Sequence, residues 1–221
     1  MKRSPLFLGL LTLCAVLLLM VYGIAAVAPL FETSTDEVAI VAPKPTQPKI
    51  DFGNPSLGPT DAALTIVVFG NYQCPSCGAF DQTVLDLLAE HPDDIRLVWK
   101  DTPNTSSYPE SRSAAIAARC AGEQGAFWEY HGTLMENQAA IDAANFPIFA
   151  LELGLDTDAF ATCLAERRPD HLIQRDIDEA IALGVNATPY VFVGDKPLSG
   201  ALSKEQLSIM ISTILTGLST P

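Results

Sequence analysis

Two cysteines separated by a proline and a serine, Cys74-Pro75-Ser76-Cys77, are the residues of this sequence best placed to do chemistry. The apolar run 64–69 before them predicts a strand, and Pro75 favours the first position of a helix. The unpaired N–H groups and the dipole at a helix start favour negative charge, which lowers the pKa of a thiol there. We therefore predict that Cys74 is the nucleophile of a thiol–disulfide exchange, and that Cys77, one turn into the helix, is its shielded resolving partner.

Two other interpretations of this cysteine pair remain open at this point. The pair would serve as half of a zinc site if two further ligands stood at similar spacing, but His91, His131 and His171 each stand alone. The pair would also serve as a static structural disulfide. We favour redox chemistry, with no metal and no cofactor.

Hydrophobic periodicity predicts the elements that must position the pair. In chain order they are strand 64–69, helix 75–90, strand 95–99, a mainly helical stretch over 109–183, strand 190–193, its hairpin partner 197–198, and a last helix that begins at a capping box over 203–206. The first three form a βαβ unit with parallel strands. The predicted fold class is α/β, with a sheet and a helical insertion.

Two features near the predicted site have alternative interpretations. Lys100 ends the second strand, and we expect a solvated lysine there; the alternative is that it assists thiolate formation. The aromatic run 127–131 is expected to pack in the core of a helix, and the alternative is that it lines a substrate groove.

Composition excludes some classes of protein. The chain has 221 residues, a net charge of −13 and 48% hydrophobic residues. An acidic chain binds nucleic acid poorly, so we expect no nucleic-acid partner. The hydrophobic content excludes a mostly disordered chain.

The N-terminal residues predict a membrane segment. A cytoplasmic tail over 1–5 precedes an apolar stretch over 6–28, which is long enough to cross a bilayer as a single transmembrane signal-anchor. A Pro-rich linker over 29–49 then leads to a folded domain over 50–217. This pattern predicts a single-pass protein of the cell membrane with its domain outside the cytoplasm. The alternative is cleavage after 26–28 and secretion.

The residues Phe69 to Cys77, together with Val185 to Tyr190, resemble the DsbA-type thiol:disulfide oxidoreductases of the thioredoxin superfamily. Membrane-anchored bacterial DsbA-like proteins are the most similar. The resemblance covers roughly residues 50–217 and implies a thioredoxin fold (βαβ–ββα) with a helical insertion at about 105–183.

The resemblance also assigns substrate-binding residues. It implies that Pro189 forms a cis peptide bond beside the cysteines, and that the backbone edge at Thr188 pairs with an extended substrate. Pro75 and Ser76 complete this set. Ser76 departs from the best-known oxidase, which has histidine there, so strong oxidising power is less certain.

Two further cysteines, Cys120 and Cys163, lie on apolar faces of predicted helices. Some DsbA-like relatives have a second disulfide in the insertion, and this likeness implies a structural bridge between them. The alternative is two buried free thiols.

The predicted function is an extracytoplasmic thiol:disulfide oxidase that introduces disulfides through Cys74 and Cys77. Its expected partners are exported proteins with free thiols and a quinone-linked membrane protein that reoxidises it, both implied by the resemblance. One alternative is a reductase or isomerase with the same site, since the reduction potential decides the direction. Another is a non-enzymatic metal chaperone that binds copper(I) through its thiols.

Overall fold

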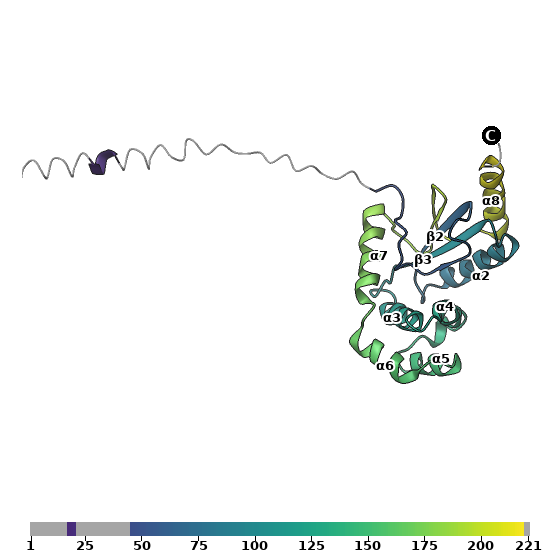
Figure 1. Ribbon diagram of the computed structural model, residues 1–221, viewed down its shortest axis with the longest axis horizontal. Coiled ribbons are helices and arrows are strands. Elements are labelled where there is room, and N and C mark those ends of the chain that lie inside the picture. The colour runs from purple at the N-terminus through teal and green to yellow at the C-terminus, as the bar shows by residue number, and fades with distance from the viewer. Residues whose placement is uncertain (1–16, 21–44, 219–221) are drawn as a thin grey trace, which may run out of the picture. The chain divides into compact units, whose positions relative to one another are not determined.

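The structure is a computed structural model that describes residues 17–20 and 45–218 (Figure 1). The chain divides into two units, Met1–Pro43 and Lys44–Pro221, and each is described by itself. In the first unit, the described residues are helical. The second unit contains the sheet, the remaining helices and the cysteines of the predicted site.

The predicted location in the cell membrane is contradicted, because no described helix is long and apolar enough to span a bilayer. Among the described residues of the second unit, the longest helix is α2, with 16 residues. That corresponds to about 24 Å of helix, less than the roughly 30 Å thickness of a bilayer core. Apart from residues 17–20, the predicted segment 6–28 lies outside the described residues, as do the predicted tail 1–5 and most of the linker 29–49.

The predicted strand–helix–strand unit is present and places the cysteine pair. It consists of β2 (Leu64–Gly70), α2 (Pro75–Glu90) and β3 (Ile95–Asp101). The two strands pair in parallel along their whole length, so both end at the same edge of the sheet. Since α2 begins just beyond that edge, Cys74 lies at the carboxyl end of the central strand.

Three shorter strands complete a five-stranded sheet with the order β1-β3-β2-β4-β5. The hairpin of β4 (Tyr190–Val193) and β5 (Lys196–Ser199) adds antiparallel strands next to β2, as predicted. The two-residue strand β1 (Ser56–Leu57) pairs antiparallel with β3 on the other side. The sequence pattern at 56–57 does not indicate this strand.

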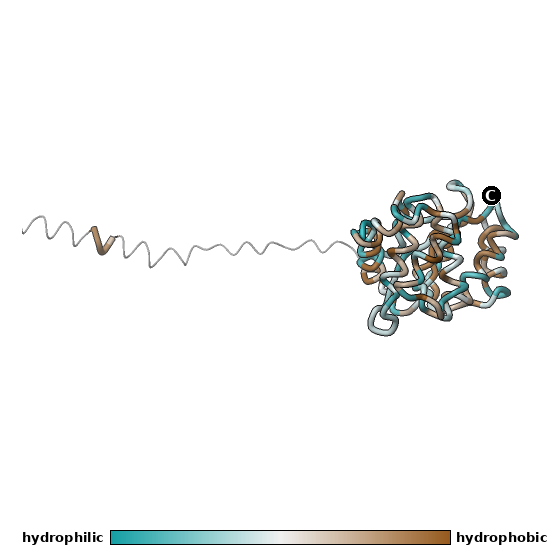
Figure 2. Tube along the Cα trace, turned by 90° about the horizontal axis from the view of Figure 1, so that it is seen from below, coloured by the Kyte–Doolittle hydropathy of each residue, from teal (hydrophilic) through white to brown (hydrophobic). Residues whose placement is uncertain are grey.

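Helices cover both faces of the sheet. Alternate residues of β2 point to opposite faces, so Ile66 and Val68 join the larger core with α2 and α8 (Lys204–Leu218). Val67 and its neighbours on the other face pack against α7 (Asp170–Leu183). Figure 1 shows α7 on one side of the sheet and α2 with α8 on the other. In Figure 2 the hydrophobic residues are concentrated inside this unit.

The predicted helical insertion lies between β3 and β4, and α7 is its last helix. The insertion also contains α3 (Ser111–Gly122), α4 (Phe127–Glu136), the 3-10 helix η2 (Gln138–Ala140), α5 (Phe146–Glu152) and α6 (Thr157–Glu166). Helix α3 lies at its centre and contacts the other α-helices of the insertion. Its buried residues are mostly alanines, which allow neighbouring helices to approach closely.

The predicted capping box begins α8. The backbone N–H of Gln206 donates to the Ser203 hydroxyl over 3.2 Å, and the N–H of Ser203 donates to the Gln206 side-chain oxygen over 3.0 Å. These bonds satisfy two donors that a helix start leaves free. They fix the start of the helix that packs beside α2.

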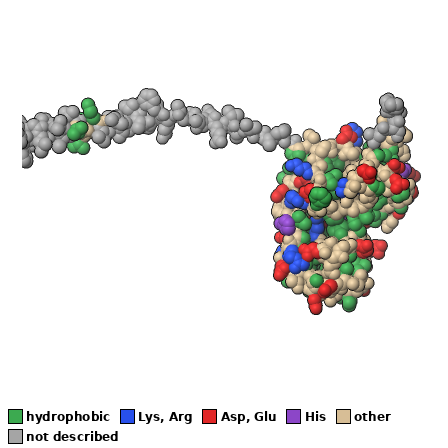
Figure 3. All heavy atoms as spheres, viewed as in Figure 1, with side chains coloured by type: hydrophobic (Ala, Val, Ile, Leu, Met, Phe, Trp, Pro, Cys, Tyr) green, Lys and Arg blue, Asp and Glu red, His purple; other side chains and the backbone are tan. Residues whose placement is uncertain are grey.

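The surface of the folded unit carries charges of both signs. On the face shown in Figure 3, Lys and Arg side chains lie among Asp and Glu side chains instead of forming one basic patch. Exposed ion pairs such as Arg168 with Glu123 belong to this mixed surface.

Candidate active site

Cys74 is the N-cap residue of α2, with an extended backbone (φ −86°, ψ 116°), and Pro75 follows as an early helical residue. The loop from β2 turns through a hydrogen bond of 3.1 Å from the Cys74 N–H to the Asn71 carbonyl. The Cys74 carbonyl accepts the N–H groups of Cys77 and Gly78, at 3.0 and 3.3 Å. No side chain caps this helix start. The positive end of the helix dipole therefore lies at Cys74.

Both thiols of the pair are reduced and buried, but their surroundings differ. The Cys74 sulfur lies 3.1 Å from the Ser76 hydroxyl oxygen and 3.4 Å from the Thr188 carbonyl oxygen. The Ser76 hydroxyl also donates to that carbonyl, over 3.4 Å. Cys74 is 6% exposed and Cys77 is 2% exposed. Polar groups near the surface thus surround the first sulfur, whereas the second lies in the core.

These surroundings move the two pKa values in opposite directions. Burial alone would raise the pKa of Cys74, but hydrogen bonding with Ser76, Thr188 and Cys77 outweighs burial and holds that pKa below its ordinary value. Burial raises the pKa of Cys77 to about 12, and negative charge on Cys74 adds to the effect. Cys74 is therefore the thiol that ionises first, which is the order expected for a nucleophile and its resolving partner.

The predicted cis peptide bond between Thr188 and Pro189 is present. Strand β4 begins at the next residue, and the Gly200 N–H donates to the Pro189 carbonyl over 2.9 Å. Because the Thr188 carbonyl accepts the Cys74 thiol, this loop faces the sulfur. The structure therefore brings Thr188 and Pro189 to the cysteine pair across 114 positions of sequence.

The exposed residues at this place are Pro75 and Ser76, beside the partly exposed Thr188. They surround the sulfur of Cys74, which is the more exposed of the two cysteines. Chemically, the arrangement can present a thiolate to a sulfur atom of another chain. The substrate-binding roles of these residues remain predictions.

The two remaining cysteines of the folded unit are bonded to each other. The structure contains the Cys120–Cys163 disulfide, with a Cα–Cα distance of 5.8 Å. It joins α3 to α6 within the insertion, and both residues are 1% exposed. The bridge is separate from the free pair at the start of α2.

Comparison with known proteins identifies the family. A family model described as thioredoxin matches residues 52–213. The chain belongs to the thioredoxin family. It is also similar to the Na(+)/H(+) antiporter NhaA 1 of Salinispora arenicola, with 38% identity over 160 residues, which cover 72% of this chain and 24% of the antiporter. The chain thus spans about a quarter of the length of the curated relatives it matches.

Solved structures with the thioredoxin fold agree with this identification. A thioredoxin-like oxidoreductase from Silicibacter pomeroyi DSS-3 has a TM-score of 0.67 and 28% identity, over 75% of this chain and 94% of that one. The thiol-disulfide exchange protein α-DsbA2 from Wolbachia pipientis has a TM-score of 0.67 over 74% of this chain and 88% of that one. At 20% identity, the second comparison shows the fold alone. Together with the family model, these neighbours confirm the predicted resemblance to DsbA-type thiol:disulfide oxidoreductases, but they do not show the membrane anchor of the DsbA-like proteins named above.

Beside the cysteine pair of this thioredoxin domain lies a buried polar cluster that sequence analysis missed. The Tyr72 hydroxyl is 2.9 Å from His131 Nδ1, and His131 Nε2 is 2.9 Å from an Asp81 carboxylate oxygen. Gln138 Nε2 donates to the carbonyls of Tyr72 and Cys74, at 2.7 and 2.9 Å. The one signal in the sequence was an aspartate within the apolar stripe of α2.

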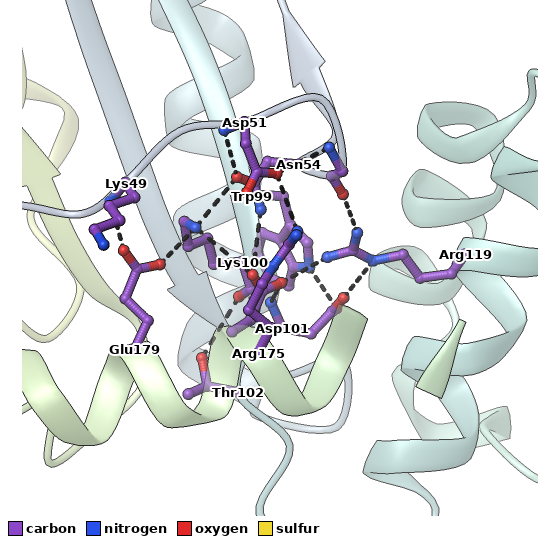
Figure 4. Close-up of polar contacts among 12 residues, drawn as sticks. Lys49, Asp51, Asn54, Trp99, Lys100, Asp101, Thr102, Arg119, Arg175 and Glu179 are labelled. Atoms are coloured by element: carbon purple, nitrogen blue, oxygen red, sulfur yellow. Dashed lines mark hydrogen bonds and ion pairs between the residues drawn. The ribbon is translucent and has the colours of Figure 1, made fainter. Parts of the chain in front are cut away.

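Lys100 is not the solvated lysine expected from the sequence, since its side chain is 2% exposed. Its Nζ lies 2.6 Å from Glu179, 3.6 Å from Asp176 and 3.2 Å from the Asn54 side-chain oxygen (Figure 4). A lysine can be buried when charged and polar groups surround its ammonium in this way. These contacts join Lys100 to α7 and to the segment before β1. They show no contact with the cysteines.

A second buried cation completes the cluster drawn in Figure 4. Arg119 donates to Asp101 over 2.7 Å and to Asp176 over 2.6 Å, and its third partner is the Gly53 carbonyl. Asp101 also accepts the indole N–H of Trp99 over 2.8 Å. The cluster fixes the segment before β1 onto the thioredoxin fold, at the end of β3.

Within residues 17–20 and 45–218, no group of three or more His, Cys, Asp or Glu side chains is placed to hold a metal ion. The free thiols among the described residues are those of Cys74 and Cys77.

Proposed function

We propose that this chain is a thiol:disulfide oxidoreductase that works as an oxidase and forms disulfides in proteins with free thiols. The observation that carries the proposal is the contrast between the two thiols. Cys74 has a lowered pKa at a helix start, whereas burial raises the pKa of Cys77 to about 12. A nucleophile that also leaves readily as a thiolate suits both steps of disulfide exchange.

In the oxidised protein, a substrate thiolate attacks the Cys74 sulfur of the Cys74–Cys77 disulfide. The bond between the cysteines breaks, Cys77 takes a proton, and a mixed disulfide joins Cys74 to the substrate. A second substrate thiolate then attacks the substrate sulfur of this bond and releases Cys74 as a thiolate. Two electrons pass from the substrate dithiol to the cysteine pair, which ends reduced.

The oxidase direction rests on the stability of the reduced form. Hydrogen bonds that stabilise the Cys74 thiolate stabilise the reduced protein, and this makes its disulfide a stronger oxidant. The same site would act as a reductase or isomerase if its reduction potential were low. Equilibration with glutathione distinguishes these functions, because the oxidase is expected to stand mostly reduced while glutathione is oxidised.

An oxidase of this kind needs an acceptor for the two electrons that it gains. We propose a quinone-linked disulfide protein as the partner, by analogy with DsbA-type proteins. The test is reoxidation of the reduced protein in a cell extract. Reoxidation should stop when quinones are removed and resume when they are added back.

The roles of the two cysteines are tested by mixing variants with a dithiol peptide. Cys74→Ser should abolish peptide oxidation, and Cys77→Ser should accumulate a mixed disulfide through Cys74. The double variant Cys120→Ala/Cys163→Ala is the control, because it removes buried cysteines but leaves the reactive pair. Equal trapping by Cys74→Ser and Cys77→Ser would overturn the assignment.

A further inference from the structure

We propose that His131 of helix α4 is a positioning residue that holds both ends of the Cys74–Cys77 motif in register. This inference rests on the proposed function, because it concerns how the redox pair is held. His131 contacts one residue before the motif and one residue after it. It comes from the helical insertion, so a helix outside the βαβ unit fixes the geometry of the pair.

The contacts use both ring nitrogens. Nδ1 of His131 lies 2.9 Å from the Tyr72 hydroxyl, and Nε2 lies 2.9 Å from Asp81. Burial raises the pKa of Tyr72 well above its usual range, so its phenol stays protonated and donates to Nδ1. The ring proton is then on Nε2 and is donated to the Asp81 carboxylate. His131 and Tyr72 are each 1% exposed, and Asp81 is 8% exposed.

The first contact fixes the loop that leads into the motif. Tyr72 lies inside the turn closed by the hydrogen bond from the Cys74 N–H to the Asn71 carbonyl. Its ring packs against Trp99 with the centroids 5.3 Å apart, and Gln138 holds its carbonyl. With the ring, the carbonyl and the hydroxyl all held, Tyr72 cannot shift without moving Cys74.

The second contact fixes the helix that follows. Cys74, Cys77 and Asp81 are spaced i, i+3 and i+7, which places them on one face of α2. Asp81 is a buried aspartate on a helix face that otherwise packs into the core. Its bond to His131 therefore resists rotation of α2 about its axis. Such a rotation would move the Cys74 sulfur relative to the Thr188 carbonyl, which lies outside α2.

The alternative is that His131 serves only to pack the core, a role that does not require hydrogen bonds to both Tyr72 and Asp81. The His131 ring does pack among aromatic rings, with centroids 4.7 Å from Trp99 and 5.0 Å from Trp128. Packing explains the burial of the ring. The hydrogen bonds differ from it because they join the two flanks of the redox motif, 59 and 50 positions away in the sequence.

The test measures the Cys74–Cys77 equilibrium with glutathione and the pKa of the Cys74 thiolate. Loss of one such hydrogen bond changes an equilibrium constant by a factor of about five to ten. We expect His131→Gln and Tyr72→Phe to weaken the oxidising power of the pair by about that factor and to raise the pKa of Cys74. The control is His171→Gln, an exposed histidine of α7 that contacts the Arg168 carbonyl, and it should change neither quantity.

Tyr72→Phe keeps the ring and removes only the hydroxyl, so it decides the question if His131→Gln fails to fold. The inference is wrong if these variants lower the unfolding midpoint but leave both the equilibrium and the thiolate pKa as in the wild type. That result would mean a purely structural role. Failure of the wild-type protein to exchange with glutathione would instead overturn the proposed function, and the thiolate pKa would still test the role of His131.

Discussion

The Ser76 hydroxyl oxygen lies 3.1 Å from the Cys74 sulfur, at the exposed start of α2. A thiolate has no proton to donate, so the serine must be the donor once Cys74 ionises. Ser76 carries no positive charge, and its presence in the motif left the strength of the oxidant in doubt. The contact shows how an uncharged residue at this position still favours the thiolate.

Ser76→Ala should raise the pKa of Cys74 by about one unit, because one hydrogen bond to a charged group near the surface is lost. The reaction of Cys74 with an alkylating reagent should slow accordingly at neutral pH. Thiolate absorbance measured against pH gives the pKa directly. Ser212→Ala, an exposed serine of α8, is the matched control. An unchanged pKa in Ser76→Ala would show that the contact does not stabilise the thiolate.

The stability of the reduced protein should depend on pH through Cys77. Its pKa is about 12 in the folded state and 9.0 as an ordinary thiol, so unfolding releases its proton between these values. The stabilising contribution is complete below pH 9.0 and is lost as the pH rises toward about 12. Compared with Cys77→Ala, the reduced wild type should lose up to about 1.4 kcal/mol per pH unit in that range.

Urea unfolding of the two reduced proteins at a series of pH values checks this expectation. Cys74 is present in both proteins, and because its pKa is lowered in the wild type, most of its own titration there lies below this pH range. A difference in unfolding free energy that stays constant across the range would contradict the burial of an un-ionised Cys77.

Removal of the second disulfide should destabilise the protein but leave its chemistry intact. The bridge closes a loop between positions 43 residues apart, which corresponds to about 4 kcal/mol in the chain-entropy estimate. We therefore expect Cys120→Ala/Cys163→Ala to unfold at a much lower urea concentration, with peptide oxidation retained under native conditions. Cys74→Ala/Cys77→Ala should instead lose peptide oxidation and keep most of its stability toward urea. Loss of oxidation in the first variant while it remains folded would mean that the bridge takes part in catalysis.

Asp176→Ala should destabilise the folded unit by about 3–5 kcal/mol. Asp176 is fully buried and lies 2.6 Å from Arg119 and 3.6 Å from Lys100, so its removal leaves two buried cations short of a partner. Asp178→Ala, on the exposed side of the same helix, is the control and should change stability by less than about 0.5 kcal/mol. Equal unfolding midpoints for the two variants would refute this account of the cluster.

The main elements could be predicted from the sequence because their signals are local. Helix α2 begins at Pro75 and ends at Glu90 as expected, since proline, the apolar stripe and the following strand all lie within one short stretch. The strand Ser56–Leu57 had no such signal. It exists through pairing with β3 and a hydrogen bond from the Trp128 indole to the Ser56 carbonyl, which are contacts between distant segments.

The candidate site shows the same limit. The cysteine pair was found because its chemistry is contained in four consecutive residues. His131 had no apparent partner, because Tyr72 and Asp81 lie more than 40 positions before it. Lys100 was misjudged for the same reason, since its buried partners come from α7, more than 70 positions later.

The edge strand β5 has a consequence for the proposed function, in which the substrates are incompletely folded chains. Such chains expose unpaired backbone N–H and C=O groups. An open sheet edge can pair with these groups and so act as a template for aggregation. Strand β5 is only four residues long, and its Pro197 has no N–H to offer a new neighbour. The neighbouring Lys196 adds an exposed charge, which opposes pairing of β5 with a strand of another chain. If the chain is the oxidase proposed above, a substrate protein bound through Cys74 would find little free backbone on strand β5 on which to form further strands.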